Sequence, residues 1–415
     1  MSRPKIEKRL GMYVFTWVEE QVVINVARIR EHRDGHTTCQ LTVRLLPPYE
    51  GSGHLYQAQF NLSAARARLD LAKMLNARYN APWPEMLEQF CVYSLELFRE
   101  GEPIIEIRSV KHPIPPPFLV KPLLYENQPN VIFGDPGTGK GYLALLVACC
   151  AQIPWKDNPF GFEVKNEPQK ALVLDWETEE ADHIYRLSLL TNGLGLEEQV
   201  ILYRHCARSF MEEIEEIHQK IADAGITLLI VDSLGPACGD DLNPSAPPIA
   251  FFNALRRLRV TSFIIAHTSK GEGGKKTIYG STFFTALARS VWEIRTAQEP
   301  GSSEMQIALF HRKSNPGKIQ KPLGFHFSFF EDGLIINRTD IAEIPEFAEQ
   351  LPVRMRLEQS LRGGSLTIKE LGDELGIKQD TIRKTLNRFR QRFTRVGDKW
   401  GLLTRHEKEV PEVYK

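Results

Sequence analysis

Residues 130–150, NVIFGDPGTGKGYLALLVACC, join an apolar strand-like run to a helical segment through a loop that contains four glycines. The loop, Gly134–Gly141, matches the phosphate-binding pattern G-x-x-x-x-G-K and stands between strand and helix, as that motif requires. Its glycines let backbone N–H groups surround a phosphate chain, the helix N-terminus adds positive potential, and Lys140 reaches the terminal phosphates. A glycine-rich turn without a ligand is the alternative. The stretch therefore predicts an α/β fold built around a nucleotide.

One position of this loop departs from the motif. The Ser or Thr that normally follows the lysine, and whose hydroxyl binds magnesium directly, is replaced by Gly141. Adenylate kinases resemble the chain in having glycine at this point, so water can complete the metal shell. The predicted ligands are ATP and magnesium. The residues assigned to nucleotide binding are Gly134, Asp135, Pro136, Gly137, Thr138, Gly139, Lys140, Gly141 and Tyr142.

Apolar runs alternate with helical segments beyond the loop. The runs at 170–176, 200–204, 227–232 and 262–267 are each followed by a helical segment, which predicts a parallel sheet sandwiched between helices. Later runs at 304–312, 325–329 and 334–338 have no helices between them and predict an antiparallel edge. We therefore expect one α/β domain over residues 123–345.

Two strand ends carry acids that suit hydrolysis of a phosphate chain. The run TLLIVD ends in Asp232, which would hold magnesium through water, with a helix cap as the alternative. The run KALVLDWETEE places Asp175 within another strand and Glu177 just beyond it, at the sheet edge where ligands collect. Glu177 is the predicted general base that polarises the attacking water, and a solvated acidic turn is the alternative.

The order of these motifs, phosphate loop, Glu177, Asp232 and then His267, resembles that of RecA-type ATPases, and in particular the plasmid RepA-like replicative helicase family. The similarity covers about residues 113–338. It rests on FGDPGTGKGYLAL, ALVLDWETEE, LLIVDSLGPACGDDLN, IIAHTSKG, YGSTFFTALARSVWEIR and KSNPG. The resemblance implies a RecA-like fold and ring hexamers that hydrolyse ATP between subunits and pull single-stranded DNA through the centre.

The resemblance also assigns roles to residues outside the phosphate loop. His267 would sense the γ-phosphate and pass the signal to DNA-facing loops, with a buried structural histidine as the alternative. Arg289 matches the arginine that family members present to the neighbouring subunit's nucleotide, an arginine finger in trans, with a structural salt bridge as the alternative. Lys313 is a second candidate cation for that interface.

The loops at 235–248 and 268–280 would line the DNA channel according to the same resemblance. The second loop carries the predicted DNA-binding residues Lys270, Lys275 and Lys276 among glycines, which would let these lysines follow a phosphate backbone. Ordinary solvent-exposed lysines are the alternative.

The segments before this domain predict a smaller one. Residues 1–110 carry four β-forming runs and then two helical segments, the first opened by Ser63 as its N-cap, and predict a small α+β domain of unknown role. Its arginines form a solvated face or a nucleic-acid surface. Residues 111–122 hold five prolines and predict a stiff linker.

Residues 351–405 predict a winged helix-turn-helix, with three short helical segments, the second capped by Thr367, and a hairpin. They hold 13 Lys or Arg against 6 Asp or Glu, so the neutral chain contains a basic module. The segment 379–393 is the predicted recognition helix, and protein docking is its alternative role. The residues offered to duplex DNA are Arg383, Lys384, Asn387 and Arg388, with Lys399 and Trp400 at the wing.

Composition excludes several classes of protein. The 415 residues are 42% hydrophobic and 25% charged, which predicts several globular domains rather than a disordered or fibrous chain. Equal numbers of basic and acidic residues, 52 each, exclude a wholly basic nucleic-acid coat, and six cysteines without a CxxC pair predict neither a zinc module nor a disulfide framework. No signal peptide or run of about 18–20 apolar residues occurs, so we expect a soluble, cytoplasmic protein without a membrane partner.

The sequence as a whole predicts an ATP-hydrolysing DNA helicase or translocase for replication of a plasmid, phage or mobile element. The alternatives are a recombinase-like or DNA-remodelling RecA-type ATPase without unwinding, and a nucleotide-switched DNA-binding regulator. The predicted partners are single-stranded DNA in a ring channel, duplex DNA at the C-terminal module, and further copies of the chain in a hexamer.

Overall fold

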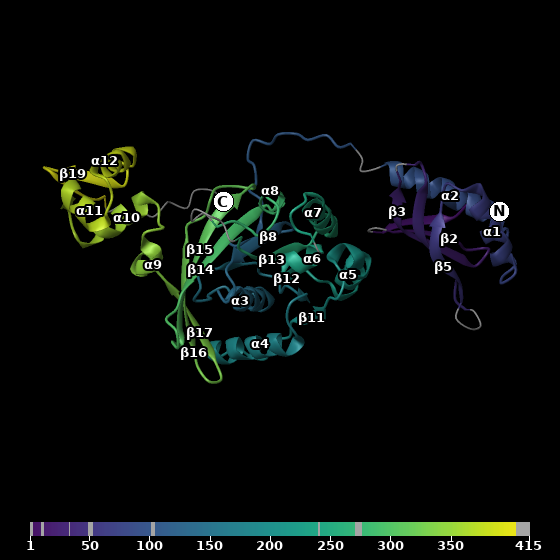
Figure 1. Ribbon diagram of the computed structural model, residues 1–415, viewed down its shortest axis with the longest axis horizontal. Helices are drawn as coiled ribbons and strands as arrows, with labels where there is room; N and C mark the ends of the chain where they lie inside the picture. The colour runs from purple at the N-terminus through teal and green to yellow at the C-terminus, as the bar shows by residue number, and fades with distance from the viewer. Residues whose placement is uncertain are drawn as a thin grey trace. The chain divides into compact units, whose positions relative to one another are not determined.

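The computed structural model describes residues 3–9, 12–32, 34–48, 53–100, 104–239, 241–269 and 276–403 (Figure 1). The chain forms two compact units. One comprises residues 1–115, 208–225 and 253–259, and the other comprises residues 116–207, 226–252 and 260–415.

The N-terminal sheet is antiparallel, and its strands pair in chain order. Buried and half-exposed residues alternate along its inner strands, so one face forms a core around Phe15 and Trp17 with the two helices that follow. The first strand was not predicted, because its sequence KIEKR carries four charges and is largely exposed. The strands are β1 (Lys5–Arg9), β2 (Met12–Trp17), β3 (Val22–Glu31), β4 (Thr37–Leu45) and β5 (His54–Asn61).

The predicted N-cap of the first helix is wrong. Helix α1 (Ala65–Asn76) has Ala64 as its N-cap, without a side-chain bond. Ser63 is used in the preceding turn instead, where its hydroxyl donates to Asn61 Oδ1 at 2.7 Å and accepts from the N–H of Thr37 at 3.1 Å. Helix α2 (Trp83–Glu100) follows, and Trp83 lies in the same core.

The proline-rich segment ends earlier in the chain than predicted. Residues 104–117 form no helix or strand, but β6 (Phe118–Lys121) is a strand paired with β7 (Leu124–Tyr125) and β9 (Glu163–Val164). The run FLVK contains no proline, and Leu119 and Val120 are buried, so packing favours a strand over an open linker there.

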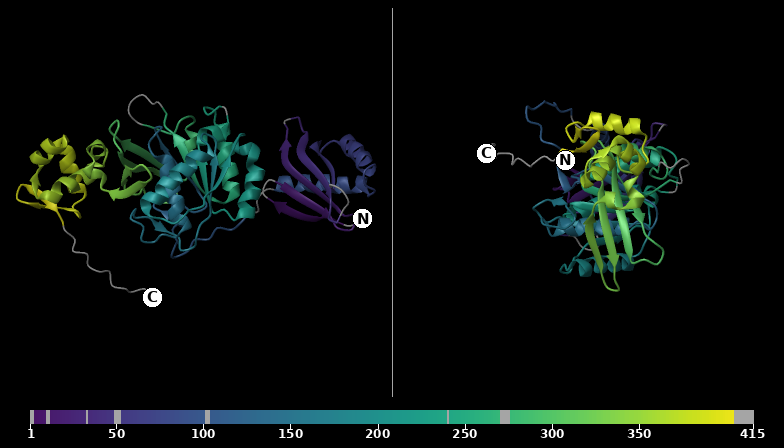
Figure 2. Two further views of the ribbon diagram at one scale, coloured as in Figure 1. Left: turned by 90° about the horizontal axis from the view of Figure 1, so that it is seen from below. Right: turned by 90° about the vertical axis from the view of Figure 1, so that its left-hand side faces the viewer.

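The large sheet has the strand order β11-β10-β12-β13-β8-β14-β15-β16-β17. The right-hand view of Figure 2 shows the yellow-green arrows of its last strands. The strands from β11 to β14 are parallel and the rest are antiparallel, as the alternation of strands and helices predicts. The bounds are β8 (Pro129–Gly134), β10 (Ala171–Asp175), β11 (Leu202–His205), β12 (Leu228–Asp232), β13 (Thr261–His267), β14 (Ser290–Ala297), β15 (Glu304–Ser314), β16 (Leu323–Phe329) and β17 (Leu334–Thr339).

Helices α3 (Lys140–Gln152) and α4 (Glu180–Leu194) follow β8 and β10. Helix α3 is buried along most of its length, and α4 contacts both α3 and β17. The approach to β17 requires glycine, since a Cβ at Gly193 would lie 2.2 Å from the carbonyl oxygen of Leu334. The other helices up to β14 are α5 (Phe210–Ala224), α6 (Leu234–Cys238), α7 (Ala246–Leu258) and α8 (Phe283–Leu287).

Residues 353–403 form the three α-helices α10, α11 and α12 and a small antiparallel sheet of order β18-β20-β19. Their core gathers around Leu357, Leu371, Leu386 and Trp400. The elements after β17 are η1 (Ile341–Glu343), α9 (Pro345–Ala348), α10 (Val353–Ser360), η2 (Leu361–Gly363), β18 (Leu366–Thr367), α11 (Ile368–Leu375), α12 (Gln379–Arg388), β19 (Phe393–Val396) and β20 (Lys399–Leu402).

None of the helices in the described ranges is both long enough and apolar enough to span a bilayer. The six cysteines, all at described positions, are free thiols, and burial raises the pKa of Cys39, Cys91, Cys149 and Cys238 to about 12. The expectation that they form no disulfide framework is therefore confirmed.

The cap of α11 gives a test of the C-terminal fold. Thr367 Oγ1 accepts from the N–H of Glu370 at 3.2 Å, and Glu370 Oε2 accepts from the N–H of Thr367 at 2.7 Å. Thr367→Ala should destabilise this helix end by about 1 kcal/mol and speed amide hydrogen exchange in its first turn about fivefold. Thr381→Ala, an exposed site inside α12, is the control, and equal exchange in both variants would contradict the assignment of this cap.

Candidate active site

The carboxyl ends of four neighbouring strands meet at one edge of the large sheet. In register, Asp175 of β10 pairs with Asp232 of β12, and His267 of β13 pairs with Gly134 of β8. Because parallel strands end at the same edge, this row brings the phosphate loop together with the acids and the histidine that the motifs predict.

The phosphate loop encloses its own lysine. Lys140 is 6% exposed, and its ammonium group donates to the carbonyl oxygens of Gly134 at 3.1 Å and Asp135 at 2.7 Å. Burial lowers the pKa of Lys140, against the effect of nearby acids. Gly139 has a φ of +79°, and a Cβ there would lie 2.9 Å from Ile307 Cδ1, so the loop requires glycine at this point.

Glu177 lies between two donors from neighbouring strands. The Ser233 hydroxyl donates to its Oε1, and His267 Nε2 lies 3.1 Å from Oε1 and 3.2 Å from Oε2. The hydrogen bond with His267 is the main cause that holds the pKa of Glu177 below its usual value, so the carboxyl group is ionised at neutral pH. An ionised carboxylate can accept a hydrogen bond from a water molecule and orient it.

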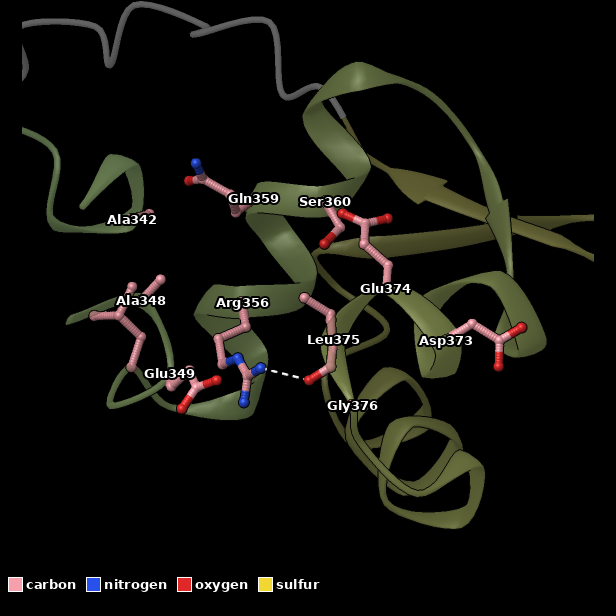
Figure 3. A pocket seen from close by; sticks show the side chains of 11 residues that line it. Ala342, Ala348, Glu349, Arg356, Gln359, Ser360, Asp373, Glu374, Leu375 and Gly376 are labelled. Atoms are coloured by element: carbon pink, nitrogen blue, oxygen red, sulfur yellow. Dashed lines mark hydrogen bonds between the residues drawn. The ribbon is translucent and has the colours of Figure 1, made fainter. Parts of the chain in front are cut away.

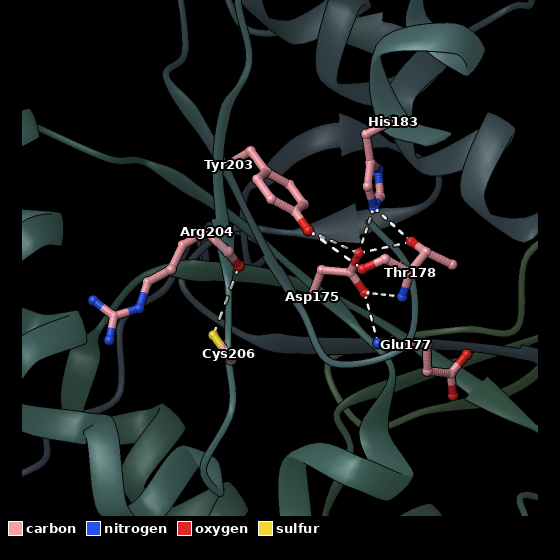
Figure 4. A network of polar contacts seen from close by, with 7 residues as sticks. All are labelled: Asp175, Glu177, Thr178, His183, Tyr203, Arg204 and Cys206. Carbon is pink, nitrogen blue, oxygen red and sulfur yellow. Dashed lines mark hydrogen bonds and ion pairs between the residues drawn. The ribbon is translucent and has the colours of Figure 1, made fainter. Parts of the chain in front are cut away.

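Asp175 is fully buried and holds the turn that carries Glu177 (Figure 4). Its Oδ1 accepts from the backbone N–H groups of Glu177 at 2.9 Å and Thr178 at 3.1 Å. Its Oδ2 accepts from Thr178 Oγ1 at 2.7 Å and from the Tyr203 hydroxyl at 3.4 Å, and His183 Nε2 lies 2.9 Å away. Burial alone would raise the pKa of Asp175, but these hydrogen bonds, led by that of His183, hold it below its usual range. Asp175 therefore positions Glu177.

Asp232 ends its strand with a carboxylate that no described side chain or backbone donor pairs with. The residue is 7% exposed, and burial, together with Asp175 and Glu177 nearby, raises its pKa to about 6. Such a carboxylate fits Mg²⁺, which proteins bind through one or two carboxylates with phosphate oxygens and water. Among the described residues no group of three or more His, Cys, Asp or Glu side chains could hold a metal by itself.

The segment after β13 is attached to the phosphate loop. Thr268 Oγ1 and Lys276 Nζ both bond to the carboxylate of Asp135. The bond with Lys276 is the main cause that lowers the pKa of Asp135. Lys276, predicted to contact DNA, is thus bound in this structure to a residue of the nucleotide site.

The same segment turns back on itself. Thr268 pairs with Ile278 in an antiparallel bridge, and the N–H of Tyr279 donates to the carbonyl of His267 at 2.9 Å. This short ladder holds residues 277–279, which directly follow Lys276, beside His267 and the two residues after it. The predicted DNA-binding residues Lys270 and Lys275 lie outside the described residues.

Arg289 lies at the opposite edge of the sheet from its own phosphate loop. Its N–H donates to the carbonyl of Pro129 at 3.0 Å, where β8 begins. Gly134 lies five residues further along β8, about 16 Å at roughly 3.3 Å per residue. Arg289 therefore cannot reach a phosphate chain bound by its own loop.

Lys313, the second candidate cation for a subunit interface, is used within its own chain. Its ammonium group donates to three carbonyl oxygens at the end of α8, at 2.8, 2.6 and 2.7 Å, which belong to Thr285, Ala286 and Ala288. Carbonyls at a helix C-terminus are natural partners for a lysine, so this contact is a structural cap.

The predicted recognition helix presents its cations to solvent. Arg383, Lys384 and Arg388 are exposed on α12. Trp400 lies in β20 of the hairpin that was predicted as the wing, but its side chain is 6% exposed and part of the core, because it faces the opposite side of β20 from the exposed Lys399.

A separate pocket lies beside the C-terminal helices (Figure 3). The Arg356 guanidinium donates to the carbonyl of Leu375 at 2.5 Å across it. Its described lining includes no residue of the phosphate loop or of the strand ends, so it is not the nucleotide site. The lining residues are Ala342, Ala348, Glu349, Leu351, Arg356, Gln359, Ser360, Asp373, Glu374, Leu375 and Gly376.

Some residues of the site were not predicted from the sequence. Ser233 and Thr268 directly follow Asp232 and His267, so their position after a marked strand end was a usable signal. Arg186 on α4 approaches Gly141, but only the packing of α4 beside α3 brings the two together.

Comparison with known proteins agrees with this geometry. Residues 99–273 match a family model described as an AAA domain, which supports a P-loop ATPase domain of the AAA type that binds and hydrolyses nucleotide. The matched range contains the phosphate loop, Glu177, Asp232 and His267, and ends before Arg289. No curated protein matches the chain.

The Asp175 network predicts a stability effect at Thr178. Thr178→Val removes the hydroxyl that donates to a buried carboxylate, so it should lower the free energy of unfolding by about 1.5–3 kcal/mol in urea titrations. Thr178→Ser keeps the hydroxyl and is the matched control. ATP hydrolysis should also fall in the valine variant, because the turn that carries Glu177 loosens. If the valine and serine variants unfold at the same urea concentration, Thr178 does not support this turn.

Proposed function

We propose that this chain is an ATP-driven DNA helicase or translocase that resembles the plasmid RepA-like replicative helicases and serves replication of a plasmid, phage or mobile element. The observation that carries the proposal is the continuous row at one sheet edge. The phosphate loop, Glu177, Asp232 and His267 lie side by side there, and Asp135 joins the loop to the segment after β13. A motor needs such a link between its phosphate site and a surface that can hold DNA.

The residues of the row divide the chemistry of hydrolysis. Lys140 neutralises the charge of the terminal phosphates. Its ammonium group donates to the carbonyls of Gly134 and Asp135 in this structure, and phosphate oxygens would accept those hydrogen bonds when the nucleotide is bound. Asp232 would hold Mg²⁺, which supplies further charge neutralisation when bound. Glu177 orients the attacking water by accepting its hydrogen bond. His267 contacts Glu177, and its carbonyl accepts from the N–H of Tyr279, so a change at the γ-phosphate would reach the chain after β13 through His267.

Assembly into a ring is part of the proposal. Arg289 lies at the edge of the sheet far from its own phosphate loop. From there it could contact the phosphates of a nucleotide bound to a neighbouring copy of the chain. This placement supports an arginine finger in trans and a hexamer with single-stranded DNA at its centre.

The C-terminal residues support a second candidate function. Three helices with a hairpin suit a winged helix-turn-helix, and α12 exposes Arg383, Lys384 and Arg388 on one short helix. A module of this kind would bring duplex DNA to the motor. The same module is compatible with a nucleotide-switched regulator, whose activity would be sequence-specific binding to duplex DNA rather than unwinding.

Strand displacement separates these functions. A duplex with a single-stranded tail and a blunt duplex of the same sequence are incubated with the protein and ATP. Unwinding that requires both ATP and the tail supports the helicase. ATP hydrolysis stimulated by DNA without displacement indicates a remodelling ATPase, and tight binding to one duplex sequence without either indicates the regulator.

Glu177→Gln should retain ATP binding but hydrolyse ATP at least about 100-fold more slowly, because the amide cannot polarise water as the carboxylate does. Binding and steady-state hydrolysis are measured on the same preparation. Lys140→Ala is the comparison, and it should lose hydrolysis through loss of phosphate neutralisation while the protein stays folded. An unchanged rate in Glu177→Gln would transfer the base role to another acid.

Mixed assemblies test the role of Arg289. An Arg289→Ala subunit keeps an intact phosphate loop, and a Lys140→Ala subunit keeps an intact arginine. Mixing the two inactive variants should restore part of the ATPase, in proportion to the interfaces that pair both working halves. Subunit exchange is followed with fluorescent labels, and a mixture that exchanges but stays inactive would exclude action in trans.

A further inference from the structure

The loop position that lacks its hydroxyl residue faces an arginine from another helix. A Cβ built on Gly141 would lie 3.1 Å from Arg186 Nη1 and 3.9 Å from Arg186 Cζ. A Ser or Thr at this position would extend from that Cβ to bind magnesium. The Arg186 guanidinium therefore lies next to the space that a Ser or Thr side chain at position 141 would occupy.

The charge of Arg186 acts on the same group of residues. Burial is the main cause that raises the pKa of Asp232, and Arg186 opposes that shift. Burial likewise raises the pKa of Tyr142, the residue after Gly141, and Arg186 again opposes the shift. The guanidinium thus lies within electrostatic reach of both Asp232 and the first turn of α3.

Among the described residues, Arg186 has no bonded partner that accounts for this position. It is half-buried, and no hydrogen bond, ion pair or ring contact joins its side chain to any residue in the described ranges. Arg295 of the large sheet, which is also half-buried, is by contrast paired and bonds to Glu293 at 2.6 Å. A guanidinium offers five N–H donors in a planar fork that matches phosphate oxygens. An anionic ligand such as a phosphate group would satisfy the donors of the Arg186 guanidinium.

We propose that Arg186 binds the nucleotide's phosphates from within the same subunit, in the space that glycine at position 141 leaves open. The inference rests on the proposed ATP site and adds a specific residue to it. Arg186 and Gly141 form one unit, since a larger side chain at 141 would displace the arginine. The guanidinium then supplies charge neutralisation that a hydroxyl-held magnesium ion supplies in loops with Ser or Thr.

Nucleotide binding without metal tests this role directly. ATP affinity is measured by displacement of a fluorescent ATP analogue in excess EDTA, so that no hydrolysis or magnesium contributes. Arg186→Gln should weaken ATP binding about tenfold or more, the loss expected for a charge-assisted hydrogen-bonding pair. Arg186→Lys should recover only part, because an ammonium group lacks the fork. Lys170→Gln, an exposed lysine where β10 begins, removes the same charge and should bind as the unmodified chain does.

A double-mutant cycle tests the shared space. Gly141→Ser alone places its Cβ against Arg186 and should change the affinity for magnesium–ATP little, because it gains a metal ligand while displacing the arginine. The same serine in the Arg186→Gln background has room to bind the metal, so it should strengthen magnesium–ATP binding there by about threefold or more over its effect in the unmodified chain. Additive effects would overturn the claim that the two residues compete for one space.

The outcomes also separate this inference from the proposed function. If the unmodified chain binds no ATP, the ATP site itself fails. If it binds ATP, and Lys140→Ala weakens binding while Arg186→Gln equals Lys170→Gln, the ATP site stands and the role of Arg186 is overturned. If Arg186→Gln loses ATP affinity while Lys170→Gln does not, and the circular dichroism spectrum of Arg186→Gln is unchanged, the inference is supported.

Discussion

The register of the central parallel strands is the constraint on which the site depends. Asp175 stands opposite Asp232, and Gly134 opposite His267, so a shift by one residue would turn each side chain to the other face of the sheet. Their strands are buried on both faces, and the apolar packing that fixes their register also fixes the row of polar groups at their carboxyl ends. Packing that supplies stability thus also supplies catalytic geometry.

The electrostatics of this row explain why its three acids behave differently. Asp175 and Glu177 are two residues apart and Asp232 lies opposite Asp175 on the neighbouring strand, but each acid has a different set of donors. Asp175 is saturated by hydrogen bonds, Glu177 shares two donors, and Asp232 has none among the described residues. Burial raises the pKa of both Asp175 and Asp232, but hydrogen bonds to Asp175 outweigh that effect and hold its pKa low, although it is the more buried of the two. The acid without a partner is the one that suits a cation.

Contacts around the phosphate loop join it to two other parts of the chain. Through Asp135 it contacts Thr268 and Lys276, and through Gly141 it faces Arg186. Each contact places a cation or hydroxyl group close to where phosphates bind. A phosphate chain carries several negative charges, so its arrival changes the electrostatic balance of all these groups together. Nucleotide binding can therefore affect the residues after β13 through electrostatic interactions, without a moving element between the two.

The sequence by itself determined the local features: the glycine loop, the strand that precedes it, the alternation of strands and helices, and the acids and histidine at strand ends. Those signals lie within about ten residues of chain, where backbone geometry and hydrophobic periodicity act. Only the tertiary structure decided which of them touch. Lys276 meets Asp135 across 141 residues, and His267 meets Glu177 across 90, because the order of strands in the sheet brings these ends together. Arg186 gained its place beside Gly141, and Trp400 its place in a core, through packing between elements, which no local pattern records.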